Sequence, residues 1–218
     1  MNIINKLKEI NLSCAVVVAK NIKLNESDSD LTRDLKALII TKSQEEFDPE
    51  LKKGIRDLLK TGGFKPTGRN KPASEYLAQA AREDRFPFIN NLVDINNYVS
   101  LLSGLPISLL DFDKLSENVL IRQGKEDESY VFNQGGQEIK LKGLICTCSG
   151  DENVSIPMGN PIKDSMEGKI TENTNSVFGI IYSNNEIISN EKLSEYLEIF
   201  KKMLINYAMA SQTKTFIL

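Results

Sequence analysis

The chain has 218 residues, of which 40% are hydrophobic and 26% charged, a balance typical of a soluble globular protein with a sizeable core. No stretch approaches the roughly 20 apolar residues that a membrane-spanning helix needs, and the apolar run over residues 14–19 is too short for a signal peptide, so neither is expected. The net charge of −3 argues against a protein that covers nucleic acid without regard to its sequence.

The numbers of cysteines and histidines limit the catalytic mechanisms and metal sites that the chain can form. The three cysteines, Cys14, Cys146 and Cys148, are an odd number, which fits a reducing compartment, and we expect a cytoplasmic protein. Cys146 and Cys148 alternate along a predicted strand, so we expect two buried thiols on one face rather than a metal or redox pair. The absence of histidine excludes Ser-His-Asp and Cys-His nucleophiles and histidine-based zinc sites. We expect no metal or cofactor.

The first part of the chain predicts one strand followed by two helices. Residues 12–19 form a short β-branched run bounded by polar residues, which is typical of a buried strand. A cluster of cap-competent residues precedes a predicted helix over 31–41. A second helix is expected to begin with Asp48 as N-cap and Pro49 at its first position, and to end at the glycine pair 62–63.

Two further helices are predicted in the central third. Pro72 marks the start of the first, because a proline there loses no helical hydrogen bond. The second carries Asn90, Asp94 and Asn97 at spacings of four and three, so we expect them to share one face. Three short polar side chains on an otherwise apolar helix favour a buried hydrogen-bonded network over direct catalysis. Asp94 is still the best-placed carboxylate for activating a water, since burial would raise its pKa.

Basic residues gather just before these helices. Residues 52–85 hold nine basic and four acidic residues, and the loop in the middle of this segment carries Lys65, Arg69 and Lys71. Such a patch could contact a phosphate backbone, and a solvated helical surface explains it about equally well.

The second half of the chain predicts short strands and a closing helix. A hairpin turn is expected over 134–137, a polar loop over 150–174, and an amphipathic helix over 191–209. The strands are expected over 107–110, 119–122, 129–132, 138–141, 144–148, 154–157 and 177–182. The simplest organisation is one α+β domain over 1–218, with helices first, then a mixed or partly barrel-like β core, and a helix at the C-terminus.

A family resemblance rests on the order of several motifs. They are Asn90-Asn91-Leu92-Val93-Asp94-Ile95-Asn96-Asn97-Tyr98-Val99, then Gly104-Leu105-Pro106, then Asp111-Phe112-Asp113-Lys114. This order resembles domains three and four, the tRNA-binding and editing module, of the bacterial phenylalanyl-tRNA synthetase beta chain. The resemblance covers about residues 55–182, and it is nearest the free-standing form of the module because nothing resembles a synthetase catalytic core.

The resemblance implies a pocket that hydrolyses a mischarged aminoacyl-tRNA ester. On this basis we expect Asp94 to be catalytic, and Lys65, Arg69 and Lys71 to contact RNA. The pocket residues expected are Asn90, Asn97, Ser108, Asp164, Ser165 and Thr171. Surface-loop solubility explains Asp164, Ser165 and Thr171 as well. Two positions depart from the family pattern: Ser108 stands where the family carries a pocket histidine, and Ile180 where it carries a glutamate that reads the tyrosine hydroxyl.

Two functions follow from these observations. The first is binding of tRNA or aminoacyl-tRNA, with hydrolysis of a mischarged ester in trans as the associated activity; DNA and membranes are not expected partners. The alternative is a non-catalytic binding module for a small ligand or a protein, which has lost the editing pocket. A complete aminoacyl-tRNA synthetase is excluded, because no adenylate-forming motif is present.

Overall fold

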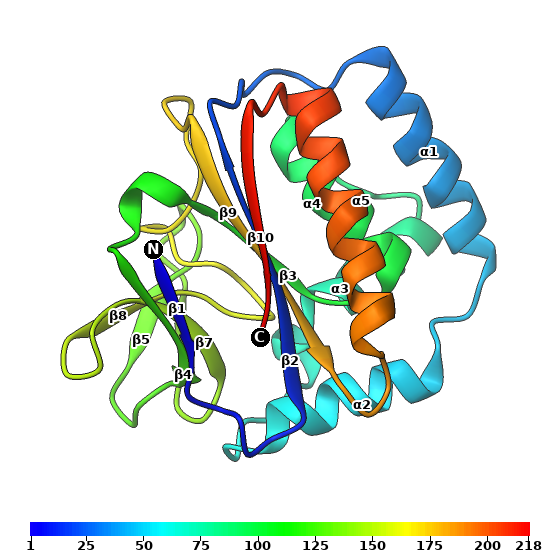
Figure 1. The fold of residues 1–218 in the computed structure, drawn as a ribbon. Coiled ribbons are helices and arrows are strands. Elements are labelled where there is room, and N and C mark those ends of the chain that lie inside the picture. Colours follow the sequence, from blue (N-terminus) through cyan, green and yellow to red (C-terminus); the bar gives the residue numbers. More distant parts are fainter.

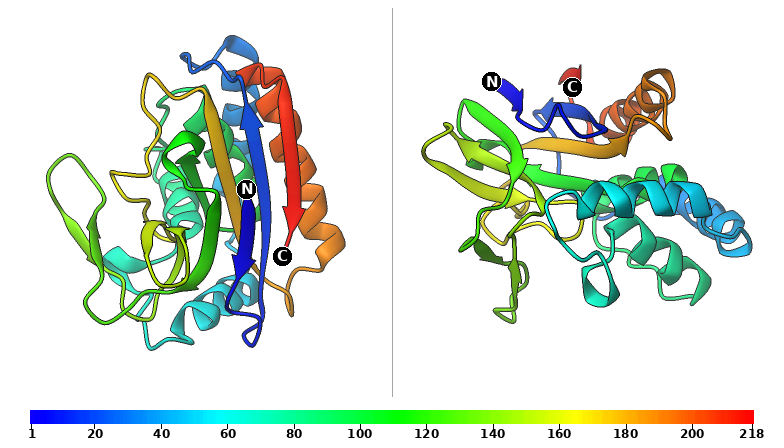
Figure 2. Two further views of the ribbon diagram at one scale, coloured as in Figure 1. Left: turned by 60° about the vertical axis from the view of Figure 1, so that its left-hand side comes forward. Right: turned by 90° about the horizontal axis from the view of Figure 1, so that it is seen from below.

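In the computed structural model, which describes residues 1–218, strand β2 (Leu12–Lys20) runs through the middle of the molecule and is buried along almost all of its length. Its alternate side chains enter two separate apolar clusters: Ala15 and Val17 pack with helices, whereas Cys14 and Val16 pack with a second sheet. A continuous β-branched run suits a strand that is covered on both faces. The molecule therefore has three layers: helices, a central sheet and a second sheet (Figures 1 and 2).

The α+β class and the mixed sheet predicted from the sequence are confirmed. The central sheet is antiparallel, in the order β10-β2-β9-β3, with β3 Ile107–Asp111, β9 Ser176–Asn184 and β10 Gln212–Ile217. The second sheet is mixed, in the order β1-β4-β7-β8, with β1 Asn2–Asn5 parallel to β4 Asn118–Gln123, then β7 Ile145–Gly150 and β8 Ser155–Gly159. A small hairpin pairs β5 Ser129–Val131 with β6 Glu138–Lys140. Neither large sheet closes into a barrel.

Five α-helices begin where the sequence predicts them. They are α1 Ser29–Gln44, α2 Pro49–Lys60, α3 Ala73–Arg82, α4 Asn91–Ser103 and α5 Asn190–Ala208. The cap of α2 shows why: the Asp48 carboxylate accepts hydrogen bonds from the backbone N–H groups of Glu50 and Leu51. Asn90 caps α4 in the same way, accepting from the N–H of Val93. None of the helices combines the length and apolar composition that crossing a membrane requires.

The helices cover one face of the central sheet and one of its ends. Figure 1 shows α1, α3, α4 and α5 on the same side of the sheet, with α2 across its lower end. Leu51 and Ile55 of α2 join the cluster under the helices, whereas Leu58 and Leu59 join the cluster between the sheets. Helix α2 therefore links both halves of the core.

Four elements were not predicted: β1, β10 and two short 3₁₀ helices, η1 (Gly68–Asn70) and η2 (Phe112–Lys114). Strand β10 follows the predicted C-terminal helix, after a turn at Met209 with a left-handed φ of +58°. The expected arrangement of the two β7 thiols is confirmed, because Cys146 and Cys148 both lie fully buried in the cluster between the sheets.

Candidate active site

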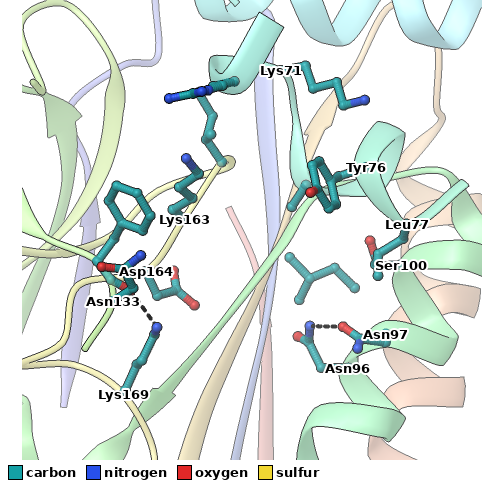
Figure 3. A pocket seen from close by; sticks show the side chains of 15 residues that line it. Lys71, Tyr76, Leu77, Asn96, Asn97, Ser100, Asn133, Lys163, Asp164 and Lys169 are labelled. Carbon is teal, nitrogen blue, oxygen red and sulfur yellow. Dashed lines mark hydrogen bonds between the residues drawn. The ribbon is translucent and has the colours of Figure 1, made fainter. Parts of the chain in front are cut away.

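A cavity of about 350 Å³ separates helices α3 and α4 from the segment that follows β8 (Figure 3). The helical wall presents Tyr76, Leu77, Asn96, Asn97 and Ser100. The facing wall presents Asn133 from the β5–β6 loop together with Ile162, Lys163, Asp164 and Lys169, and the loop before α3 adds Arg69 and Lys71. Segments more than 60 residues apart in sequence thus line one cavity.

One face of α4 forms part of the helical wall. Asn96, Asn97 and Ser100 line the cavity and Val93 lines an adjoining one, a spacing of three, one and three that is typical of a single helix face. The side-chain nitrogen Nδ2 of Asn96 lies 3.5 Å from the side-chain oxygen Oδ1 of Asn97. The Oδ1 of Asn96, in contrast, is buried without a hydrogen-bond partner. An acceptor in the cavity wall is therefore unsatisfied.

Asp164 supplies the carboxylate of the facing wall. Its Oδ2 accepts a hydrogen bond from the Leu109 N–H at 3.0 Å, while its Oδ1 is buried without a partner. Burial raises the pKa of Asp164 to about 6, although nearby donors, including Ser108, and the charge of Lys169 act in the opposite direction. Oδ1 packs closely against the backbone of Gly159, because a Cβ at that position would lie only 2.7 Å from it.

Four cationic side chains line the same cavity as this carboxylate: Arg69, Lys71, Lys163 and Lys169. Lys163 Nζ lies 4.0 Å from the centre of the Phe132 ring, and Lys169 Nζ donates to the Phe132 carbonyl oxygen at 2.5 Å. The pKa of Lys163 is lowered by burial and by the nearby positive charge of Arg69. With Arg69 and Lys71 at the cavity margin, the lining carries more positive than negative charge, which favours an anionic ligand.

A second chamber of about 410 Å³ adjoins the first. It shares Asn96, Asp164 and Lys169 with the first cavity, and its remaining lining residues are Ile89, Asn90, Val93, Leu109 and Ile170. The shared residues therefore mark the junction between a cationic chamber and a second one, the apolar chamber, whose remaining walls are apolar except for Asn90.

Asp94 lies outside both chambers. Its Oδ2 accepts from the Ser27 hydroxyl at 2.6 Å and its Oδ1 from the Ile89 N–H at 3.0 Å, and burial raises its pKa. Since each helical residue turns by roughly 100°, Asp94 points well away from the neighbouring Val93. The geometry is that of a buried network joining α4 to two loops.

Some of the remaining predicted site residues line the chambers, and the others lie elsewhere in the structure. Asn90 lines the apolar chamber, and Asn97, Asp164, Arg69 and Lys71 line the cationic one. Ser108 is fully buried, donating to the Asn160 carbonyl oxygen and bonding to the Tyr182 hydroxyl, each at 3.1 Å. The Ser165 hydroxyl accepts from the Gly168 N–H within a turn. Thr171 lines a third, adjoining hollow, and Lys65 is exposed outside both chambers.

The lining residues that sequence reasoning missed include Tyr76, Asn96, Lys163 and Lys169. Two of them had a local signal, because Asn96 adjoins Asn97 on the helix and Lys163 adjoins Asp164 in the loop. Nothing near Tyr76 or Lys169 in the sequence indicated that both would line one cavity.

Comparison with protein families identifies the segment that carries both chambers. The model of the B3/4 domain matches residues 64–198, which is more than half of the chain and includes every residue that lines them. This chain belongs to the B3/4 domain family. Proteins similar in sequence to this chain are beta subunits of phenylalanine–tRNA ligase. The subunit of Listeria monocytogenes (strain F2365) is 33% identical over 103 residues, and that of Aquifex aeolicus is 32% identical over 89 residues.

The similarity covers only a small part of these relatives. The matched region is 45% of this chain and 12% of the Listeria protein, and 41% of this chain and 11% of the Aquifex protein. Among solved structures, an N-terminal fragment of the phenylalanyl-tRNA synthetase beta subunit from Pyrococcus horikoshii aligns with a TM-score of 0.49 and 14% identity. That alignment covers 99% of this chain and 50% of the fragment.

Proposed function

We propose that this B3/4 domain binds the 3′ end of an aminoacyl-tRNA and hydrolyses the ester of a mischarged amino acid in trans. The observation that carries the proposal is the position of Asp164, a carboxylate in the wall of a chamber whose other charged lining residues are all cations. We place this activity in the cytoplasm and assign it to residues 1–218 acting as one domain. Asp164 takes the catalytic role for which the sequence suggested Asp94, because Asp164 lines the chamber.

Binding would use the cationic end of the cavity. Arg69, Lys71 and Lys163 offer three positive charges to the phosphates of a single-stranded 3′ end, and Lys65 lies in the exposed loop that leads to them. Tyr76, with 53% of its surface exposed, adds an aromatic side chain on the same wall. Backbone contacts of this kind do not depend on base sequence, so they would position the ester rather than select the tRNA.

Hydrolysis would occur at the junction of the chambers. Asp164 accepts a proton from water as the water oxygen bonds to the ester carbonyl carbon, and a pKa of about 6 suits a general base near neutral pH. Lys169 and the Asn97 amide supply positive charge and a donor for the developing oxyanion. The bond between the carbonyl carbon and the ribose oxygen then breaks, and the ribose oxygen takes a proton.

A deacylation assay in trans tests this proposal. Purified protein is offered a panel of correctly and wrongly aminoacylated tRNAs, and release of the amino acid is followed. Selective release of one class of amino acid is the expected result. Absence of release from every tRNA, with folding verified by circular dichroism, would contradict hydrolysis.

A non-catalytic binding module is the second candidate. Its support is the packing of the two positions that depart from the family pattern, because Ser108 and Ile180 are both fully buried. Salt dependence distinguishes the candidates. Phosphate contacts make affinity fall steeply as salt rises, whereas a small neutral ligand shows little dependence.

A further inference from the structure

The apolar chamber has a lining unlike that of its neighbour. Ile89, Val93, Leu109 and Ile170 form its walls away from the junction. The one polar residue on that side is Asn90, whose Oδ1 already accepts the N–H of Val93 at 3.0 Å as the cap of α4. An aliphatic group placed against these four side chains, in a space of about 410 Å³, would remove apolar surface from water.

The junction offers groups suited to the polar part of an amino acid. The Oδ1 of Asn96 is a buried acceptor without a partner, and it lies in the wall common to both chambers. An α-ammonium group is a donor that would satisfy it. With the ammonium there and the ester beside Asp164, the amino-acid side chain is directed into the apolar chamber.

We infer that the chamber lined by Ile89, Val93, Leu109 and Ile170 holds the side chain of an apolar, aliphatic amino acid whose α-amino group is free. This inference rests on the proposed function and names its substrate class. The ligand spans both chambers: its aliphatic side chain lies against Val93 and Ile170, its ammonium group at Asn96, and its terminal adenosine phosphate at the cationic end.

Binding of stable analogues tests the inference without requiring hydrolysis. The probes are 5′-phosphorylated 3′-amino-3′-deoxyadenosines acylated on the 3′-amino group with valine, with threonine or with N-acetylvaline, measured by calorimetry. Valine and threonine have nearly the same shape, and an apolar pocket disfavours the added hydroxyl on the order of 10–100-fold. We expect that preference for valine, and at least a tenfold loss on N-acetylation, because the acetyl group removes the positive charge from the nitrogen that Asn96 would accept.

Filling variants locate the side-chain site. Ile170→Phe and Val93→Phe, on opposite walls, should each weaken the valine analogue on the order of tenfold while leaving an alanine analogue within about threefold. Ile156→Phe is the matched control, because Ile156 is 55% exposed on β8 and lines neither chamber. Two variants on different elements guard against a misfolded one.

The outcomes separate this inference from the proposed function. Equal affinity for valine and threonine analogues, or filling variants that change neither, would overturn the inference while deacylation in trans still stood. Valine selectivity that both filling variants abolish supports the inference, even if valyl-tRNA is not hydrolysed. Failure of every analogue to bind, together with no deacylation, would overturn both.

Discussion

Ser108 on β3 and Ile180 on β9 lie directly opposite each other in the antiparallel strand pair, and both are fully buried. These are the two positions at which the sequence departs from the family pattern, so both departures occur at one place. The Tyr182 hydroxyl forms hydrogen bonds with Ser108 at 3.1 Å and with Thr147 of the second sheet at 2.7 Å, so it links the two sheets beside this pair. The pair belongs to the packed core between the sheets, and we expect no ligand to reach it.

A charge at Ile180 should therefore destabilise the fold. Ile180→Glu places a carboxylate among buried apolar side chains, and we expect the free energy of unfolding to fall by more than about 3 kcal/mol at pH 8. The loss should be smaller at pH 5, because burial raises a carboxyl pKa and the neutral acid is less costly to bury. Urea unfolding measures both values. Ile180→Val, expected to cost about 1 kcal/mol, is the control; a similar small cost for the glutamate would contradict the packed-core description.

Asp164 should make stability depend on pH. Its folded-state pKa of about 6 lies above its ordinary value of 3.8, so the folded protein binds the proton more tightly. The stability that this provides is present below pH 4 and is lost as the pH rises through about 6. Asp164→Asn should remove this dependence and be more stable than the natural protein at pH 8 by about 2–3 kcal/mol. Urea unfolding from pH 4 to 8 measures it, with the exposed Asp127→Asn as control; parallel pH profiles would refute the assignment.

Asp94 should contribute to stability through two hydrogen bonds. Asp94→Ala leaves the Ile89 N–H and the Ser27 hydroxyl without their acceptor, and we expect a loss of about 1–3 kcal/mol. Asp94→Asn keeps one acceptor oxygen, so its loss should be smaller. Thermal and urea unfolding of the two variants provide the comparison, and equal stability of Asp94→Ala and the natural protein would show that the network carries no energy.

The cationic end of the cavity should control the salt dependence of tRNA binding. Lys163→Gln or Arg69→Gln should weaken binding for all tRNAs alike. Each should also reduce the slope of log affinity against log salt by about 0.7–0.9 for every phosphate left without its cation. Lys214→Gln, on the exposed part of β10, is the matched control and should leave the slope unchanged. An unchanged slope in both cavity variants would place the tRNA elsewhere on the molecule.

The fold was predictable where local signals act. The start of α2 follows from Asp48 and Pro49, and the end of α4 from Gly104, whose left-handed φ of +72° favours glycine. Strand β10 escaped prediction because its pairing is not local: Gln212 pairs with Lys20. A short polar strand at a sheet edge has little signal of its own.

The site was predictable in composition but not in orientation. Asn97 and Asp164 were named from the sequence and line the cavity, whereas Asn96, beside one of them, was not. The rotation of α4 about its axis decides which of its residues face the chambers, and that rotation is set by packing against other elements. Asp94 was favoured because burial would raise its pKa, but its carboxylate bonds to Ser27 and the Ile89 N–H and lines neither chamber.

Single-turnover deacylation by Asp164→Asn and Asp94→Asn tests the central claim most directly. The substrate is the aminoacyl-tRNA that the natural protein deacylates fastest, and both variants are first shown to be folded. We predict that Asp164→Asn slows release by about 10²–10⁴-fold, as expected for loss of a general base, while Asp94→Asn slows it less than tenfold. Unimpaired release by Asp164→Asn, or a larger loss with Asp94→Asn, would contradict the account.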